Sequence, residues 1–455
     1  MKIPLYRSAV LCACIGGGQL APAAEPIDSL TPAPSDRALL GTAIPDRYIV
    51  QVVVAEDPRA VAASHGVSPN FVYESAVRGF AGFIPPGRLA SLRSDPRVLH
   101  VTPDRKVAAI AKPGGGGGTQ APSQIVPEGI KRIGAAPSAE LSTNGAGVGV
   151  AVVDSGVDLN HADLQPLGAA SFSAFGGSPH DNNGHGTHVA GTIAARNNFI
   201  DVVGVAPGAT IYAVKVLDAS GSGSDSNVMA GFNWIAANAA TLSPPIRIVN
   251  VSLGRVGTLD DNPALRASIN ALHTRGIAVI VAAGNDAGLE VSQQVPATYP
   301  EVIAVASTTA VAGSNLSRVF SGVIPADTAS YFTSDGDFVK PAVETGIGVT
   351  VSAPGEDQEN INKAGFIQSV GILSTKLGGG TTRMSGTSMA APHVAGVAAL
   401  LLQSRPASGA EDIRRRISAG ADRQGLVPLD SPTSRYSFDG EREGVLSAPG
   451  SLAVQ

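Results

Sequence analysis

Three side chains that could carry out acyl transfer lie at the boundaries of apolar segments. Asp154 ends the run VAVVD, His185 begins HGTHVAG, and Ser388 lies in GTSMAAPHVAG. A serine hydroxyl is a weak nucleophile at neutral pH, so an imidazole must remove its proton and later deliver it to the leaving group. A carboxylate holds that imidazole in the required tautomer. The three residue types together indicate a hydrolase with a serine nucleophile.

Each of these residues also has an ordinary structural explanation. Serine is a common N-cap, so Ser388 could cap the apolar helix that follows it. Asp154 could cap a turn, and His185 could simply begin a helix. We favour the catalytic interpretation because all three occur together and each lies at a Gly-rich boundary. Asn285, at the end of VIVAAGN, adds a candidate hydrogen-bond donor for an oxyanion.

The elements that must position these residues alternate along the second part of the chain. Strand-like apolar runs cover residues 147–154, 210–217, 246–253, 276–285 and 302–307, and helical stretches such as 185–195 and 225–240 lie between them. Continuous apolar strands between helices predict a parallel sheet with both faces covered. Functional side chains are then expected at the carboxyl ends of the strands. The Gly-, Ser- and Asp-rich segment 310–350 breaks this rhythm and is expected to be a surface insertion.

A smaller unit precedes this sheet. RYIVQVVV and NFVYESAVRGFAGFI are strand-like, DPRAVAASHG and PPGRLASLRSDP are helical, and VLHVT is a final strand. These elements predict a small α+β domain over residues 46–111. KPGGGGGTQAPS, residues 112–123, is expected to be a flexible, protease-accessible linker to a larger domain over 124–455.

The N-terminus has the pattern of a secretory signal. Lys2 and Arg7 precede a short apolar stretch and then small residues, which predicts a signal peptide over 1–24 and a Pro-rich spacer over 25–45. The two cysteines of the chain, Cys12 and Cys14, fall inside the signal, so its removal leaves no thiol and no disulfide. LCAC also resembles a lipoprotein processing site, with Cys14 as the lipidated residue.

Composition excludes several other classes. The 455 residues carry a net charge of −5, with a sequence pI near 5.9, so no basic surface indicates nucleic acid or anionic lipid. Only 15% of the residues are charged and 54 are glycine, which is typical of a well-buried, loop-rich globular protein. No segment reads as a membrane-spanning helix.

Four segments, DSGVD, HGTHVAG, AAGN and GTSMAAPHVAG, resemble the signature segments of the subtilisin-like serine peptidases, the subtilases. The resemblance covers most of residues 124–455. It implies an α/β fold with a subtilisin-like parallel sheet and helices on both faces, preceded by a small α+β ferredoxin-like pro-domain. It also implies Asp154 as the orienting acid, His185 as the general base, Asn285 as the oxyanion donor and Ser388 as the nucleophile.

The same resemblance implies where a substrate would bind. Two edge segments are expected to hold an extended peptide as an added strand, and a third segment is expected to form one wall of the pocket for the residue before the scissile bond. These residues are Gly221, Ser222, Gly223, Ser252, Leu253, Gly254, Ala282, Ala283 and Gly284. The alternative is that the two edge segments are simply turns. Gln294 could lie near the pocket base, but no preferred substrate residue is predicted.

The resemblance further implies that the chain inhibits itself before maturation. The last strand of the small domain would lie along the active-site cleft like a substrate, and self-cleavage would be expected in the GGGGG linker. The domain would then act as an intramolecular inhibitor and folding aid of its own peptidase, which is expected to be a monomer.

A structural calcium ion is also implied by the resemblance. Its ligands would be the side chains of Gln124, Asp163 and Asn198 together with the carbonyls of Arg196, Ile200 and Val202. Six hard oxygen ligands suit Ca²⁺. The alternative is an uncharged, Asn-rich turn. HGTH is not expected to bind zinc, because HExxH and ligating cysteines are absent, so His188 and His393 are expected to be packed helix residues.

The sequence therefore predicts a secreted serine endopeptidase that hydrolyses polypeptides and is made as a zymogen. A serine esterase of the α/β-hydrolase type would have the order Ser, acid, His and the motif G-x-S-x-G, whereas here Ser388 comes last and lies in GTSMA. A catalytically silent, peptide-binding relative is the second alternative, and only an activity measurement separates it from an enzyme.

Overall fold

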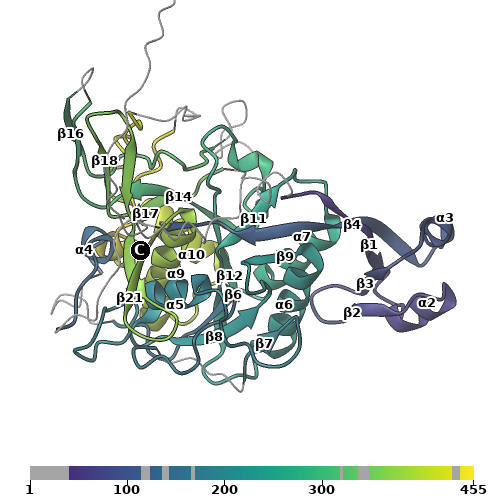
Figure 1. Cartoon of the computed structure of the whole chain (residues 1–455). Coiled ribbons are helices and arrows are strands. Elements are labelled where there is room, and N and C mark those ends of the chain that lie inside the picture. The colour runs from purple at the N-terminus through teal and green to yellow at the C-terminus, as the bar shows by residue number, and fades with distance from the viewer. Residues whose placement is uncertain are drawn as a thin grey trace, which may run out of the picture.

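The computed structural model describes residues 40–113, 123–135, 143–164, 170–317, 321–336, 348–432 and 441–455. The predicted signal peptide with Cys12 and Cys14, and the GGGGG stretch of the linker, lie outside these residues. The described chain forms a small N-terminal unit packed against one side of a larger α/β unit (Figure 1). None of the helices in these ranges is both long and apolar enough to span a membrane.

The larger unit is built on a seven-stranded sheet in the order β17-β14-β12-β10-β6-β8-β7. All its neighbouring strands are parallel, as the apolar runs predicted. The strands are β6 Gly149–Asp154, β7 Phe172–Ser173, β8 Thr210–Lys215, β10 Ile246–Val251, β12 Ala278–Ala282, β14 Ile303–Thr309 and β17 Val351–Glu356. The parallel sheet predicted from the sequence is confirmed.

Helices cover both faces of this sheet. Alternate residues of β6 point to opposite faces: Val150 and Val152 join one apolar cluster, and Ala151 and Val153 join the other. The first cluster includes residues of α5, α9 and α10, and the second includes residues of α6 and α7. These helices are α5 His185–Ala194, α6 Asp225–Asn238, α7 Pro263–His273, α9 Thr387–Ser404 and α10 Ala410–Ala419; two short helices are α4 Glu128–Arg132 and α11 Ala448–Ala453.

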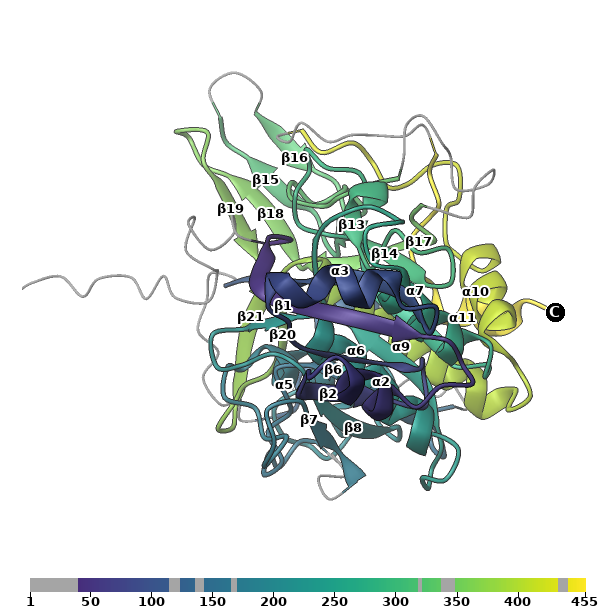
Figure 2. The ribbon, with the colours of Figure 1, turned by 90° about the vertical axis from the view of Figure 1, so that its right-hand side faces the viewer.

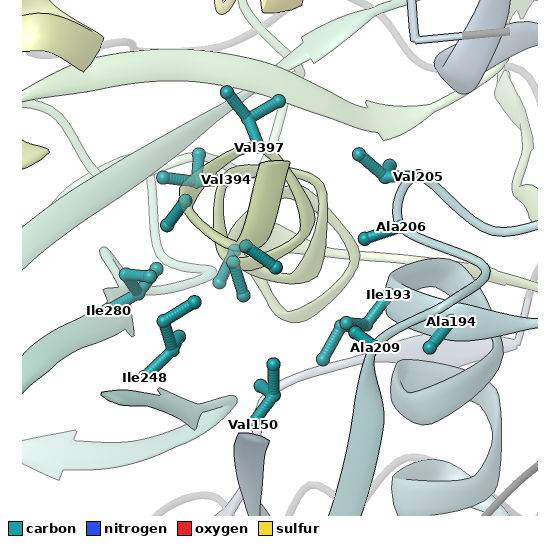
Figure 3. Packing of buried hydrophobic residues seen from close by; sticks show 14 of the residues in the cluster. Val150, Ile193, Ala194, Val205, Ala206, Ala209, Ile248, Ile280, Val394 and Val397 are labelled. Carbon is teal, nitrogen blue, oxygen red and sulfur yellow. The ribbon is translucent and has the colours of Figure 1, made fainter. Parts of the chain in front are cut away.

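The helix α9 runs through the core of the larger unit. Every residue from Thr387 to Leu402 is buried, which fits a segment that is apolar on all sides. Figure 3 shows Val394 and Val397 of this helix surrounded by side chains from the sheet and from the loop that follows α5. The helix begins one residue before Ser388, with Gly386 at the N-cap position. The interpretation of Ser388 as an N-cap is therefore wrong.

The N-terminal unit supplies four antiparallel strands of a second seven-stranded sheet, and two helices cover one face of these four strands (Figure 2). Its strands lie in the order β4-β1-β3-β2, and its own core contains Val50, Val61, Phe80, Ile84 and Leu92. The elements are β1 Ala43–Val52, α2 Pro58–Ser64, β2 Pro69–Tyr73, β3 Gly79–Phe83, α3 Pro86–Ser94 and β4 Val98–Ala109. The predicted final strand, VLHVT, is only the first part of β4.

Short strands complete the fold. The segment predicted as an insertion over 310–350 supplies two strands of a separate four-stranded sheet that also includes residues beyond it. The strands of that sheet are β15 Gly313–Asn315, β16 Gly322–Ile324, β18 Gln358–Ile361 and β19 Ile367–Val370. A three-stranded sheet contains β5 Lys112–Pro113, β20 Ile372–Thr375 and β21 Thr381–Ser385, and the remaining pieces are β9 Ser222–Ser224, β11 Leu253–Val256, η2 Val291–Gln293 and β13 Gln294–Val295.

Candidate active site

Asp154 and His185 meet at the carboxyl end of the parallel sheet. Asp154 is the last residue of β6, and His185 is the first residue of α5. The Nδ1 atom of His185 lies 2.8 Å from Oδ1 and 2.9 Å from Oδ2 of Asp154. Both side chains are buried. A buried carboxylate on Nδ1 favours the tautomer in which Nε2 is free to accept a proton.

A second carboxylate, which the sequence did not single out, fixes the start of α5 relative to β6. Asp181 is buried and accepts hydrogen bonds from the hydroxyl of Ser155, next to Asp154, and from the backbone N–H and hydroxyl of Thr187 in α5. It also accepts from the N–H of Gly184, which precedes His185. An acidic residue shortly before a helix start is the sequence signal that could have identified it.

Gly186 allows α5 to approach β6 closely. A Cβ atom at this position would lie 2.0 Å from the carbonyl oxygen of Gly156 and 3.1 Å from Cβ of Asp154. Backbone cannot yield at such a distance, so the glycine of the HGTH motif is required for the contact between His185 and Asp154.

Ser388 lies in the first turn of α9, and α9 packs against α5. The Ser388 hydroxyl donates a hydrogen bond of 3.0 Å to the carbonyl oxygen of Ser252, and the Ser252 hydroxyl donates to the carbonyl oxygen of Ser388 at 2.9 Å. The Nε2 atom of His185 is buried and makes no hydrogen bond within the part of the chain that the structure describes. The structure thus joins Asp154 to His185, while the Ser388 hydroxyl is turned toward Ser252.

Asn285 follows β12 and is held by Thr387. Its Oδ1 atom accepts hydrogen bonds of 2.9 Å from both the backbone N–H and the hydroxyl of Thr387. These contacts turn Nδ2 the other way, where it donates to the carbonyl oxygen of Ile110 at 3.0 Å. Asn285 therefore presents a donor to a peptide carbonyl, and Thr387 is the residue that orients it. No sequence signal identified Thr387 separately.

The two predicted edge segments enclose a strand of the N-terminal unit. The last part of β4 pairs antiparallel with β9 on one side and with β11 on the other. Ala108 lies opposite Ser222 and Gly254, Val107 opposite Gly223, and Ala109 opposite Leu253. Two further hydrogen bonds extend this pairing, from the N–H of Ala109 to the carbonyl of Gly221 at 2.9 Å and from the N–H of Ile110 to the carbonyl of Ser252 at 3.4 Å. All six edge residues thus lie along this strand.

The third segment lies behind the oxyanion donor. Ala282, Ala283 and Gly284 are buried, and the N–H of Gly284 donates to the Thr387 hydroxyl at 3.2 Å. Gly284 has φ +125°, and a Cβ there would lie 2.9 Å from the side chain of Gln294. Among the predicted substrate-binding residues, Gly254 lies against the side chain of Ile110. A Cβ atom on Gly254 would lie 2.9 Å from Cδ1 of Ile110.

The six residues of the predicted calcium site are brought together. The Nε2 atom of Gln124 lies 2.5 Å from the Arg196 carbonyl, 2.9 Å from the Val202 carbonyl and 3.2 Å from the Ile200 carbonyl. It also lies 3.5 Å from Oδ1 of Asn198.

An amide NH₂ has two hydrogens, so the Gln124 nitrogen cannot satisfy the four oxygens that surround it. Asp163 is buried beside this ring and accepts from the N–H of Val202, while its Oδ1 makes no hydrogen bond within the described residues. Burial raises the pKa of Asp163 to about 7. Oxygens that converge without enough donors fit a cation, with the Gln124 amide rotated to present its oxygen.

The other two histidines of these motifs lie in the core. The Nε2 atom of His188 lies 2.9 Å from the Ile372 carbonyl, and the Nδ1 atom of His393 lies 2.8 Å from the Met389 carbonyl. Burial lowers the pKa of His188 to about 3 and that of His393 to about 4, so both are neutral at ordinary pH. In the described ranges, no group of three or more His, Cys, Asp or Glu side chains could hold a metal ion.

The fold and this site define a peptidase of the subtilisin type: a parallel α/β sheet with a paired aspartate and histidine at its carboxyl edge and a serine at the start of a buried helix. A family model described as the subtilase family matches residues 145–438, which include Asp154, His185, Asn285 and Ser388. The chain therefore belongs to the subtilase family of subtilisin-like serine proteases.

Curated relatives agree with this assignment. The chain is 33% identical to M-protease of Shouchella clausii over 383 residues, which cover 84% of each protein. It is 36% identical to Subtilisin NAT of Bacillus subtilis subsp. natto over 358 residues, 78% of this chain and 77% of that protein. It is also 37% identical to a thermostable alkaline protease of Halalkalibacterium halodurans over 341 residues, 75% of this chain and 77% of that protein. The match to M-protease is longer than the segment 124–455, so the similarity extends into the N-terminal unit.

Proposed function

We propose that this chain is a secreted serine endopeptidase, made as a self-processing zymogen, that hydrolyses peptide bonds through an acyl-enzyme on Ser388. The observation that carries the proposal is the contact of His185 with Asp154 at the same sheet edge where Asn285 donates to the carbonyl of Ile110. The family membership of the chain supports the same chemistry.

In this mechanism the Ser388 hydroxyl rotates from the Ser252 carbonyl toward Nε2 of His185, which takes its proton as the oxygen attacks the peptide carbonyl. Asp154 holds the imidazole by Nδ1 and stabilises its protonated form. Asn285 donates Nδ2 to the oxygen that becomes negative, in a site already oriented by Thr387. The protonated His185 then delivers its proton to the leaving amine, and water hydrolyses the acyl-enzyme.

The edges β9 and β11 would hold polypeptide substrates as an added strand. They already do this for β4, whose residues take part in hydrogen bonds on both sides. Backbone pairing of this kind accepts many sequences, and side-chain pockets beside alternate residues give preference. This arrangement supports an endopeptidase, because the bound strand continues past the cleft in both directions.

Occupation of the cleft by β4 supports the role of residues 46–111 as an inhibitory pro-domain. No external peptide can pair with the same edges while this strand is present. The chain would therefore be inactive until the strand leaves, with residues 112–123 as the linker and 124–455 as the peptidase domain. Processing, the monomeric state and the domain boundaries are parts of this proposal.

Export rests on the signal-like residues 1–24, with a Pro-rich spacer over 25–45. The chain after residue 24 contains no cysteine, so the exported form would depend on packing and ions for stability. The alternative of a lipid on Cys14 predicts a membrane-anchored form. A membrane fraction from cells expressing the full chain distinguishes the two.

A calcium ion bound by Gln124, Asp163, Asn198 and the carbonyls of Arg196, Ile200 and Val202 is a further part of the proposal. The four oxygens around the Gln124 amide support it, as does Oδ1 of Asp163, which has no hydrogen-bond partner among the residues that the structure describes. Such an ion would stabilise the loop that follows α5 and tie the start of the peptidase domain to it. It has no part in the chemistry at Ser388.

The test is casein hydrolysis by the purified protein and by Ser388→Ala. We expect a loss of essentially all activity in Ser388→Ala and no change in Ser404→Ala, a matched change at the other end of the same helix. Persistent hydrolysis by Ser388→Ala would refute the mechanism. Folded wild-type protein that binds peptides without hydrolysing them would favour a silent peptide-binding relative, and hydrolysis of small esters but never of peptides would favour an esterase.

A further inference from the structure

The end of the N-terminal unit threads the active-site cleft in one defined register. Ala108 pairs with both edges, the N–H of Ile110 donates to the Ser252 carbonyl, and the carbonyl of Ile110 accepts from Asn285. Beyond Ala111, strand β5 pairs with β21 at Met384 and Ser385. The chain is therefore held on both sides of Ile110 and Ala111, directly in front of the turn that leads to Ser388.

The backbone at this point approaches the turn very closely. A Cβ atom on Gly386, two residues before Ser388, would lie 2.7 Å from the carbonyl oxygen of Ile110 and 3.1 Å from Cα of Ala111. The two sides of one peptide bond thus lie against the N-cap of α9. The Ile110 carbonyl already rests on the donor that would stabilise an oxyanion, so its carbon is the one placed for attack.

We propose that the first self-cleavage breaks the bond between Ile110 and Ala111, and not a bond of the GGGGG linker as the sequence suggested. This inference rests on the proposed function. The Ser388 oxygen bonds to the carbonyl carbon of Ile110, and its proton passes through His185 to the nitrogen of Ala111, which leaves as a free amine. Water then adds to the ester, which releases Ile110 as a carboxylate and returns the proton to Ser388.

The side chains of the threaded strand fit this register. Val107 is buried in the same apolar cluster as Val228 and Leu253, and Ala108 is also buried. Cδ1 of Ile110 lies over Gly254, where no side chain intervenes. The bound segment therefore has an aliphatic residue at each end, Val107 and Ile110, with two alanines between them. In this proposal the segment is the peptidase's own substrate during self-cleavage.

Cleavage at this bond has a consequence for the mature N-terminus. Gln124 already lies among the carbonyls of Arg196, Ile200 and Val202 in the uncleaved chain. The peptidase domain thus has its N-terminal contact in place before the bond is broken, and cleavage leaves residues 111–123 as an N-terminal tail on the larger fragment. Any cut within the Gly-rich stretch is a later trimming of that tail.

The experiment follows the purified full chain as it refolds from urea in H₂¹⁸O, with samples stopped in acid and analysed by intact mass and N-terminal sequencing. We expect the earliest small fragment to end at Ile110 with one ¹⁸O in its new carboxylate, and the earliest large fragment to begin at Ala111. Earliest fragments that end or begin at any other bond would overturn the assignment.

The Ser388→Ala variant distinguishes a failure of the proposed function from a failure of the assigned bond. If Ser388→Ala is cut as fast as the wild type, the proposed function itself fails. If cutting requires Ser388 but occurs at another bond, only the assignment of the bond fails.

Two pairs of variants sharpen the result. Ala111→Pro removes the N–H beside the attacked carbonyl and fixes φ, so we expect processing at this bond to slow by about 10²-fold, whereas Ala121→Pro in the linker should process normally. Ile110→Asp places a carboxylate over Gly254 and should slow processing by about 10-fold or more, whereas Leu99→Asp, on the exposed part of the same strand, should not. Equal rates within both pairs would contradict the proposal, and the wild-type fragments decide it if a variant fails to fold.

Discussion

The sheet of the larger unit and the strands of the N-terminal unit are covered in different ways. The parallel sheet of the larger unit has helices of its own on both faces, and its two apolar clusters include residues from each of its central strands. The antiparallel sheet of the N-terminal unit has helices α2 and α3 on one face only. Its other face, with Ile49, Tyr73 and Ala81, belongs to the cluster that contains α6 and α7 of the larger unit. The small unit therefore depends on the large one to bury this face of its sheet.

Polar contacts also join the N-terminal unit to helix α6 of the larger unit. Asn233 of α6 accepts hydrogen bonds from the N–H groups of Glu74, Ser75 and Ala76 at 2.9, 2.7 and 3.2 Å. Asp104 of β4 accepts from the N–H and the hydroxyl of Ser226, in the first turn of α6, at 3.0 and 2.7 Å. The chemistry belongs to the large unit alone, whereas these contacts determine how firmly the small unit is held. Changes at the two places should therefore have separable effects.

The largest effect is expected for His185→Ala. Loss of the general base should reduce both kcat/KM on peptides and the rate of self-processing by about 10⁴-fold. The N-terminal unit should stay docked, because the His185 side chain is hydrogen-bonded to Asp154 of the larger unit. Peptide kinetics and the thermal unfolding of the uncut chain measure the two effects. The control is His273→Ala in α7. A His185→Ala protein that keeps most of its activity would contradict the assignment of catalysis to His185 and Asp154.

Asn285→Ala should have the next largest effect. Removal of one oxyanion donor is expected to lower kcat by about 10²–10³-fold with little change in KM, because the donor acts mainly on the charge of the transition state. Steady-state kinetics of the processed enzyme measure this, with Asn270→Ala, an exposed position in α7, as the matched control. A change confined to KM would show that Asn285 only binds the ground-state carbonyl.

Calcium removal should weaken the large unit and leave the small one as it is. In a Ser388→Ala background, which prevents self-digestion, EDTA is expected to lower the Tm by about 5 °C or more, and Asp163→Asn should abolish the difference. Asp260→Asn, at an exposed position, should keep it. The same Tm with calcium and with EDTA in the parent protein would contradict the proposed site.

Asn233→Ala should loosen the small unit only. It leaves three backbone donors of the loop after β2 without their acceptor, which should cost about 1–3 kcal/mol of docking free energy. Hydrogen exchange of the uncut Ser388→Ala chain should then speed up in β2 and β3 and stay unchanged in β6 and α5. Asn238→Ala, in the same helix, should have no such effect. Faster exchange in both units would show that they unfold together.

The smallest effect concerns the pH dependence of docking. Burial raises the pKa of Asp104; the nearby Asp225 raises it further, while the contacts with Ser226 and Arg47 oppose this change. A raised pKa means that folding takes up a proton, so this contribution to stability is present at low pH and is lost as the pH rises from about 4 through the raised value. Asp104→Asn should reduce that slope, measured by hydrogen exchange of β4 at several pH values. An unchanged slope would show that Asp104 does not titrate in this range.

The two units also differ in how much of their structure can be predicted from the sequence. The parallel sheet follows from apolar runs that end in polar residues. The contact between Asp154 and His185 follows from a strand end and a helix start, which a parallel sheet presents at the same edge. The burial of α9 follows from a segment that is apolar all round. These features depend on the local sequence pattern. They lie in the larger unit, whose own helices cover both faces of its parallel sheet.

The features that the sequence did not reveal depend on partners far away in the chain. Residues 106–109, KVAA, form the end of β4 because β9 and β11 provide hydrogen-bond partners on both sides, which no local pattern indicates. Asn233 reads as an ordinary polar residue of α6 until the loop after β2 is placed against it. Thr387 likewise gains its role only from Asn285. In each case the second partner belongs to another element, so spacing alone could not identify the contact.

The most direct test of the central claim is the reaction of the processed protein with an organophosphonate, followed by peptide mapping. Activation of a serine by His185 and Asp154 predicts one adduct, on Ser388, that disappears in His185→Ala. Labelling of a different serine, or full peptide hydrolysis by a protein in which Ser388 remains unlabelled, would contradict the account.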